Sequence, residues 1–144
     1  MNVGQLPRWL QPAPDSLTVE IRKSGGRVAL HLLNVLWSFW VFFTVFFTDV
    51  GPAYWISLAV SYPLFLAVFG LLYIRPRRDV PVLVAAMAML AFASAPFNPS
   101  AWSYAVFACV FVSAENCTPR NAVLKILLIQ SLMLVEAWLL GWPW

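Results

Sequence analysis

Five long runs of apolar residues, separated by short polar segments, set the pattern along this chain. The runs cover residues 30–47, 53–74, 80–95, 101–114 and 122–140. A helix needs about 20 residues to cross the hydrocarbon core of a bilayer, with a usual range of about 17 to 25. The first, second and fifth runs have that length, and the third and fourth are shorter. The pattern therefore predicts an all-α polytopic membrane bundle of about five transmembrane helices.

The third and fourth runs are joined by a tight turn with the sequence Pro96-Phe97-Asn98-Pro99. They can form two short transmembrane helices or a single re-entrant hairpin, and both arrangements return the chain to the same side. We favour two short helices, because re-entrant backbone needs a lining of protein or water that a small chain barely supplies.

Composition agrees with a membrane protein. Apolar residues make up 62% of the chain and charged residues only 10%, which is far from the balance of a soluble domain. Aromatic residues make up 16%, as expected of a protein anchored at membrane interfaces. We predict that residues 1–29 form a loosely structured cytoplasmic arm and residues 30–144 a membrane domain. Its spans would cover about 30–47, 53–74, 80–95, 101–114 and 122–142.

Positive charges fall only in the segments that one orientation would place on a single side of a membrane. These residues lie before the first run, after the second and around the start of the fifth: Arg8, Arg22, Lys23, Arg27, Arg75, Arg77, Arg78, Arg120 and Lys125. The segments 48–52, 96–100 and 142–144 contain no lysine or arginine. Positive residues near the ends of spans are retained in the cytoplasm. We therefore predict that these residues set a topology with a cytoplasmic N-terminus.

Three residues inside the predicted spans are candidates for a signalling or transport role. Glu136 lies in the fifth run, where an ionisable side chain is costly and is usually functional or paired. The alternative is that Glu136 has no specific role and only reaches the outer membrane interface or stays protonated. Gln130 could hydrogen-bond a neighbouring helix, although it shares no close face with Glu136. Pro63 leaves a backbone carbonyl free in the second run and could act as a hinge.

No catalytic site is evident in the sequence. It contains no nucleophile beside a partnered base, no glycine-rich phosphate loop and no metal-ligand spacing, so no cofactor is expected. The net charge of +3 does not indicate nucleic-acid binding, because the positive residues sit at membrane boundaries. His31, one turn from Asn34, is interpreted as an interfacial side chain. Cys109 and Cys117 are predicted to lie on the cytoplasmic side, where disulfides are rare.

Several segments resemble the membrane region of DesK-type bacterial sensor histidine kinases of the proteobacterial group. Residues 98–109 read NPSAWSYAVFAC. They are similar to a segment of that family in which a turn of Pro, Asn and small residues opens a span with a Tyr-Ala or Phe-Ala core. The leader 17–37, which ends in Asn-Val-Leu-Trp, the segment 58–66 and the terminal Gly-Trp-Pro-Trp resemble further parts. The likeness runs from about Arg8 to Trp144.

The resemblance implies that residues 30–144 are the sensory input domain of a two-component histidine kinase in a bacterial inner membrane. The implied partners are the lipid bilayer, a second copy held through a downstream kinase module, and a cognate response regulator. No kinase residue lies in this chain, so kinase activity would belong to a longer protein, and His31 is not the phosphorylated histidine. Five spans from a cytoplasmic start end outside, so a sixth span is expected after Trp144.

The sensor interpretation expects bilayer thickness, temperature, lipid fluidity or a hydrophobic small molecule to act on the two short helices. Glu136, Gln130 and Pro63 would then be the polar and kinked elements that respond. Two other functions stay open. One is a small transporter or channel subunit that uses Glu136 as a proton- or cation-coupling site, and the other is a non-catalytic partner in a membrane assembly.

Overall fold

The computed structural model of the protein describes residues 7, 10–24, 36–46, 49–112, 115 and 117–141. Within these residues every regular element is helical, as the sequence predicts. In chain order the elements are α1 (Leu17–Ser24), the 3₁₀ helix η3 (Ser38–Phe46), α3 (Pro52–Ile74), η4 (Arg77–Asp79), α4 (Val80–Ser94), η5 (Pro99–Ala101), α5 (Trp102–Val112) and α6 (Pro119–Leu139). Arg8, Arg27, His31, Asn34 and residues 142–144 lie outside the described residues.

Prolines at helix ends explain most of the boundaries. Helices α3, α4 and α6 each carry a proline in their first two positions, where the missing amide proton costs no intrahelical bond. Helix α3 stops before Pro76, because Arg75 takes an extended conformation with φ −79° and ψ 155°, as residues before proline usually do. Helix α6 begins at Pro119 instead of residue 122, because the Thr118 side chain accepts a hydrogen bond from the Asn121 amide at 3.4 Å.

The third and fourth runs are confirmed as short helices. Helix α4 has 15 residues and α5 has 11, and the two pack against each other as a hairpin. Their turn is partly buried: Ala95 and Asn98 are fully shielded from solvent, while Phe97 is 55% exposed. The Asn98 side chain accepts a hydrogen bond from the Ser100 amide at 3.0 Å, which fixes the entry into η5 and α5.

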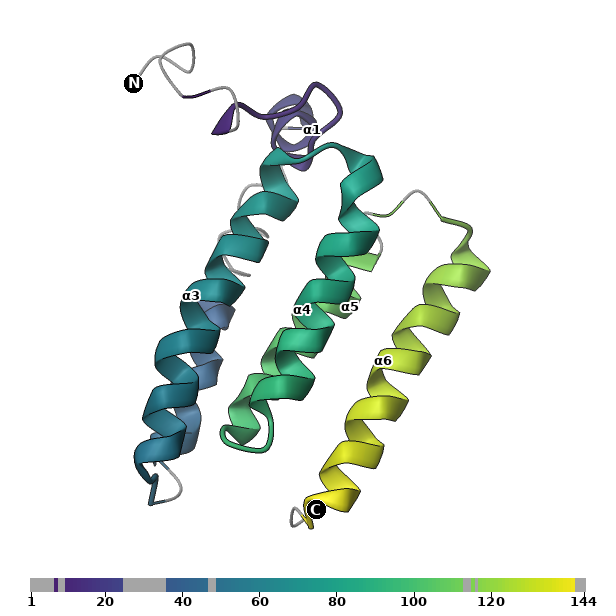
Figure 1. Ribbon diagram of the computed structural model, residues 1–144. Coiled ribbons are helices and arrows are strands. Elements are labelled where there is room, and N and C mark those ends of the chain that lie inside the picture. The colour runs from purple at the N-terminus through teal and green to yellow at the C-terminus, as the bar shows by residue number, and fades with distance from the viewer. Residues whose placement is uncertain are drawn as a thin grey trace.

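Helix α3 packs against α4, and α6 stands at the edge of the bundle, where it contacts α5 more than α4. Figure 1 shows α1 across the end of the bundle where α3 connects to α4, with the start of α6 at the same end. The α4–α5 turn, the start of α3 and the end of α6 lie at the opposite end. The bundle therefore has two distinct ends.

Six aromatic side chains form the centre of the packing between α3 and α5, and we refer to them as the aromatic column. Its members are Phe65, Phe69 and Tyr73 from α3 and Tyr104, Phe107 and Phe111 from α5. The rings of Phe65 and Tyr104 stack at 4.5 Å between centroids. Those of Phe69 and Phe111 meet edge to face at 5.6 Å. Both arrangements are favourable for aromatic pairs beyond the area they bury.

The N-terminal arm differs from the prediction, because residues 17–24 are helical and docked. The Thr18 hydroxyl donates to the Tyr73 carbonyl at 2.8 Å, and the Ala13 amide donates to the Ile74 carbonyl at 2.9 Å. Arg77 forms an ion pair with Glu20. The prediction of a loose arm was wrong for this segment, because the last turn of α3 and the connection after it offer partners that the arm's own sequence does not reveal.

The described part of the first predicted span, residues 36–46, is helical but mostly 3₁₀. A 3₁₀ run of nine residues is long, since such runs seldom exceed three or four. The segment packs beside α3, where Phe42 meets Tyr62 edge to face at 4.9 Å. The Tyr54 hydroxyl also donates to the Val41 carbonyl at 3.4 Å. The regular α-helix expected over residues 30–47 is therefore wrong for this part.

The aromatic column should dominate the stability of the fold. We expect Phe65→Ala to lower the free energy of unfolding by about 3 kcal/mol, as removal of a fully buried aromatic ring does. Phe97→Ala is the matched control, because that ring is 55% exposed. Denaturant titration followed by near-ultraviolet circular dichroism measures both. Equal effects of the two substitutions would contradict a central role for the column.

Candidate functional site

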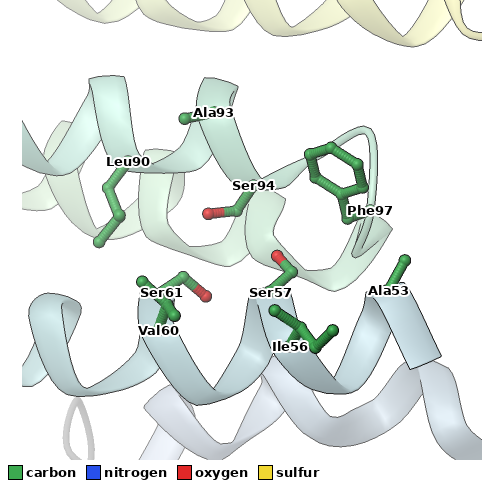
Figure 2. A pocket seen from close by; sticks show the side chains of 9 residues that line it. All are labelled: Ala53, Ile56, Ser57, Val60, Ser61, Leu90, Ala93, Ser94 and Phe97. Atoms are coloured by element: carbon green, nitrogen blue, oxygen red, sulfur yellow. The ribbon is translucent and has the colours of Figure 1, made fainter.

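A groove lies between α3 and α4. Figure 2 shows its walls, with α3 on one side and α4 and the turn after it on the other. Its volume is about 410 Å³, and its lining residues are Ala53, Ile56, Ser57, Val60, Ser61, Leu90, Ala93, Ser94 and Phe97. Volumes of about 300 to 1,000 Å³ with mostly apolar walls and few polar groups are typical of ligand sites.

Three serine hydroxyls make up the polar part of this groove. Ser57 and Ser61 lie one turn apart on α3 and face Ser94 on α4 (Figure 2). Ser61 and Ser94 are only 3% and 4% exposed. The Ser61 and Tyr104 hydroxyls are hydrogen-bonded at 3.2 Å. Ser57 is partly exposed, and its side chain and that of Ser94 both line the groove (Figure 2).

The groove and α1 lie at opposite ends of the aromatic column. Ser61 contacts Tyr104, which stacks on Phe65 at the first end of the column. At the second end, Tyr73 and Phe111 meet edge to face at 5.6 Å. The carbonyl of Tyr73 accepts the hydrogen bond from Thr18 in α1. A continuous set of packed and hydrogen-bonded groups thus joins the two ends of the bundle.

Helix α6 is held to the rest of the bundle by two polar contacts that lie on its inner side. Lys125 forms an ion pair with Glu115, whose side chain is only 2% exposed. Gln130 donates through Nε2 to the Cys109 sulfur at 3.2 Å. Sequence reasoning expected Lys125 only to set topology and did not single out Glu115. Met133 and Ala137 are the only fully buried described residues of α6, so its apolar contact with the bundle is narrow.

A second groove lies between α4 and α6 and holds this ion pair at one end. Its volume is about 330 Å³. Apart from Glu115 and Lys125 its walls are apolar, with Ala85, Ala88 and Phe92 on α4 facing residues of α6.

The three candidate residues from the sequence do not form one site. Glu136 is half-buried near the end of α6, and its Oε2 is buried without a hydrogen-bond partner among the described residues. Gln130 bonds to Cys109, as a helix-to-helix role would require. Pro63 lies on α3 with an exposed ring, inside a helix that continues on both sides. In the same turn of α3, the side chain that is buried in the core is that of Ser61.

The described positive residues gather at one end of the bundle. Arg22 and Lys23 lie on α1, Arg75, Arg77 and Arg78 lie around the α3–α4 connection, and Arg120 lies in the first turn of α6. These elements share one end in Figure 1. Arg77 pairs with Glu20, while Arg78 lies 3.6 Å from Asp79.

Within the described residues no cluster of three His, Cys, Asp or Glu side chains could hold a metal ion. Cys109 and Cys117 are both free thiols. Comparisons with protein families, with characterised proteins and with solved structures found no match for this chain. The arrangement offers binding surfaces and packed contacts, and the described residues bring no nucleophile and base together.

The buried Glu115 carboxylate should make α6 attachment depend on Lys125. We expect Lys125→Met to lower the free energy of unfolding by about 2 kcal/mol, because it leaves a buried charge unpaired, an effect reduced by the partial exposure of Lys125. The double variant Glu115→Gln/Lys125→Met should recover most of that loss, as denaturant titration would measure. Lys23→Met, at an exposed lysine on α1, is the control. A double variant no more stable than Lys125→Met alone would refute the pairing.

Proposed function

We propose that the chain is a multi-pass membrane domain with a cytoplasmic N-terminus. Two of its helices, α3 and α6, are long and apolar enough to cross a bilayer by length and composition. Large apolar side chains are exposed on three helices, including Leu64 on α3, Val82 on α4 and Leu139 on α6. Such faces are unfavourable in water and favourable against lipid. The gathering of positive residues at the α1 end supports the orientation.

Cysteine labelling tests this topology. In a Cys109→Ser/Cys117→Ser background, a cysteine replacing Arg78 should react with a membrane-impermeant maleimide only after the cells are opened. A cysteine replacing Phe97, exposed at the opposite end, should react in intact cells. Reaction of both positions from the same side would contradict the proposed orientation.

We further propose that this membrane domain is the sensory input region of a two-component histidine kinase in a bacterial inner membrane. The observation that carries the proposal is the link between the α3–α4 groove and the docked helix α1 through the aromatic column. A membrane sensor needs a lipid-accessible part, a cytoplasmic part and packed contacts between them. The kinase module and its response regulator would lie outside this chain, as the resemblance to DesK-type kinases implies.

The short hairpin of α4 and α5 suggests bilayer thickness as the physical stimulus. At about 1.5 Å per residue, α4 spans about 22 Å, against a hydrocarbon core of about 30 Å. Mismatch costs fractions of a kcal/mol per Å. A thicker bilayer would enlarge this mismatch, which a short helix relieves by standing more upright or by shifting along its neighbours instead of by tilting. The hairpin would then move against α3, and the aromatic column would carry the change towards α1. A packed interface of this kind changes between discrete arrangements instead of deforming smoothly.

Autophosphorylation of the full-length protein tests the sensory function. In phosphatidylcholine vesicles and with ATP labelled at the γ-phosphate, we expect incorporation of label at a rate that changes at least two-fold between lipids of 14 and 20 carbons per acyl chain, lengths chosen to span the mismatch. The Phe65→Ala variant should lose most of this dependence on thickness. Absence of phosphorylation in every lipid, or a rate independent of chain length, would contradict the proposal.

One observation favours a second candidate function. The Glu136 Oε2 is buried without a partner among the described residues, and an intramembrane carboxyl group of this kind is often a coupling site for protons or cations. A transporter or channel subunit would lose its flux on Glu136→Gln, while the sensory proposal expects no flux from either form.

A further inference from the structure

We propose that the α3–α4 groove binds an uncharged, mainly apolar molecule with a single hydrogen-bonding oxygen, of the class of a long-chain alcohol. The inference deepens the proposed sensory function by naming a chemical input. It rests on the membrane placement proposed above, and it does not depend on the presence of a kinase module.

The polar groups of the groove carry the proposal. Ser94 is 4% exposed and Ser57 is partly exposed, and both side chains line the groove. Figure 2 shows these two side chains facing each other across the groove. A hydroxyl can donate one hydrogen bond and accept others, so a single ligand oxygen between the two helices can bond to both serines. The hydroxyls distinguish this groove from an ordinary helix contact. Small residues without hydroxyls would only let the two helices pack closely.

The lining of the groove carries no charge, which disfavours ionic ligands. None of the nine lining residues carries a charge, so a charged group entering the groove would lose its hydration without gaining a counter-ion. The α4–α6 groove differs in this respect, because Glu115 and Lys125 lie in its wall. An amine or a carboxylate would therefore find no partner between α3 and α4, while a neutral alcohol would.

The position of the groove gives such a molecule a route of entry. Its rim residues Ile56, Val60 and Ala93 are exposed, whereas Ser61 and Ser94 are buried. The polar groups thus lie inward of an apolar opening that faces the lipid. Phe97 and Ala53 place the groove towards the end opposite α1, which the proposed topology assigns to the outer leaflet.

An occupant would act on the contact that joins the groove to the aromatic column. Ser61 belongs to the groove lining and also shares a hydrogen bond with Tyr104. A molecule that separates α3 from α4, or that competes for the Ser61 hydroxyl, would change the geometry of this bond. The bound and empty states would therefore differ at the same end of the column that the bilayer acts on.

Photolabelling of the full-length protein in phosphatidylcholine vesicles tests the site. The probe is a long-chain alcohol with a diazirine in its acyl chain, and labelled peptides are identified by mass spectrometry. We expect saturable labelling concentrated in residues 53–61 and 90–97, displaced by unlabelled 1-dodecanol. The matched diazirine amine, which carries a positive charge, should label these segments at least several-fold less.

Three variants separate binding in the groove from general exposure to lipid. Ala93→Phe fills the groove and should remove most of the labelling. The more conservative Ser57→Ala/Ser94→Ala variant should weaken binding about 30-fold, the effect of losing two net hydrogen bonds. Ala86→Phe is the matched control, because Ala86 is exposed on the same helix but does not line the groove. It should label like the unmodified protein.

Two results would overturn the inference. One is labelling spread evenly over exposed positions of α6 such as Leu127 and Leu139. The other is labelling of α3 and α4 that neither Ala93→Phe nor the double serine variant reduces. Failure of the sensory function would look different, since labelling would persist while dodecanol left autophosphorylation unchanged. Thickness-dependent autophosphorylation without labelling would leave the sensory function standing and refute the site.

Discussion

The packing of aromatic rings between α3 and α5 is the interaction on which the rest of this structure depends. Phe65 and Tyr104 are fully buried, and they stack at the level where Ser61 reaches in from α3. Each aromatic pair adds about 0.5–1.5 kcal/mol beyond the area it buries. Because the same rings connect the groove at one end with the docked α1 at the other, stability and the proposed signalling use the same contacts.

The two ends of the bundle differ in chemistry, and the difference follows from the positions of a few residues. At one end, ion pairs such as Arg77 with Glu20 and Lys125 with Glu115 hold α1 and α6 in place. At the other end, serine hydroxyls of α3 and α4 line a mainly apolar groove beside the α4–α5 turn. In the proposed membrane placement, a bilayer or a neutral amphiphile would act on the second end, while the first end would present its charges to the aqueous phase.

Much of the helical framework could be predicted from the sequence. The apolar runs located α3, α4, α5 and α6 to within a few residues, because prolines and polar turns mark their ends. The α3 half of the aromatic column could also be predicted from the spacing of its residues. Its members follow helical spacing, with Phe65, Phe69 and Tyr73 four residues apart on α3, and such a stripe indicates one packed face.

The missed features depend on partners from distant parts of the chain. Helix α1 is held by Tyr73 and Arg77, and the segment before it by Ile74. These partners lie more than fifty residues away in the sequence, so the arm alone looks unstructured. Glu115 belongs to no apolar or polar stripe that the sequence reveals. It gains its partner, Lys125, only when α6 packs against the bundle. The α3–α4 groove depends on how far two helices approach each other, a distance that spacing along one helix does not fix.

Hydrogen–deuterium exchange of the α1 amides in the full-length, bilayer-reconstituted protein tests the central claim most directly. Phe111→Leu removes the ring that packs on Phe69 and Tyr73, while Phe97→Leu changes an exposed ring. The claim that the aromatic column supports α1 predicts faster exchange over residues 17–24 in Phe111→Leu and unchanged exchange in Phe97→Leu. Equal protection of α1 in all three proteins would contradict it.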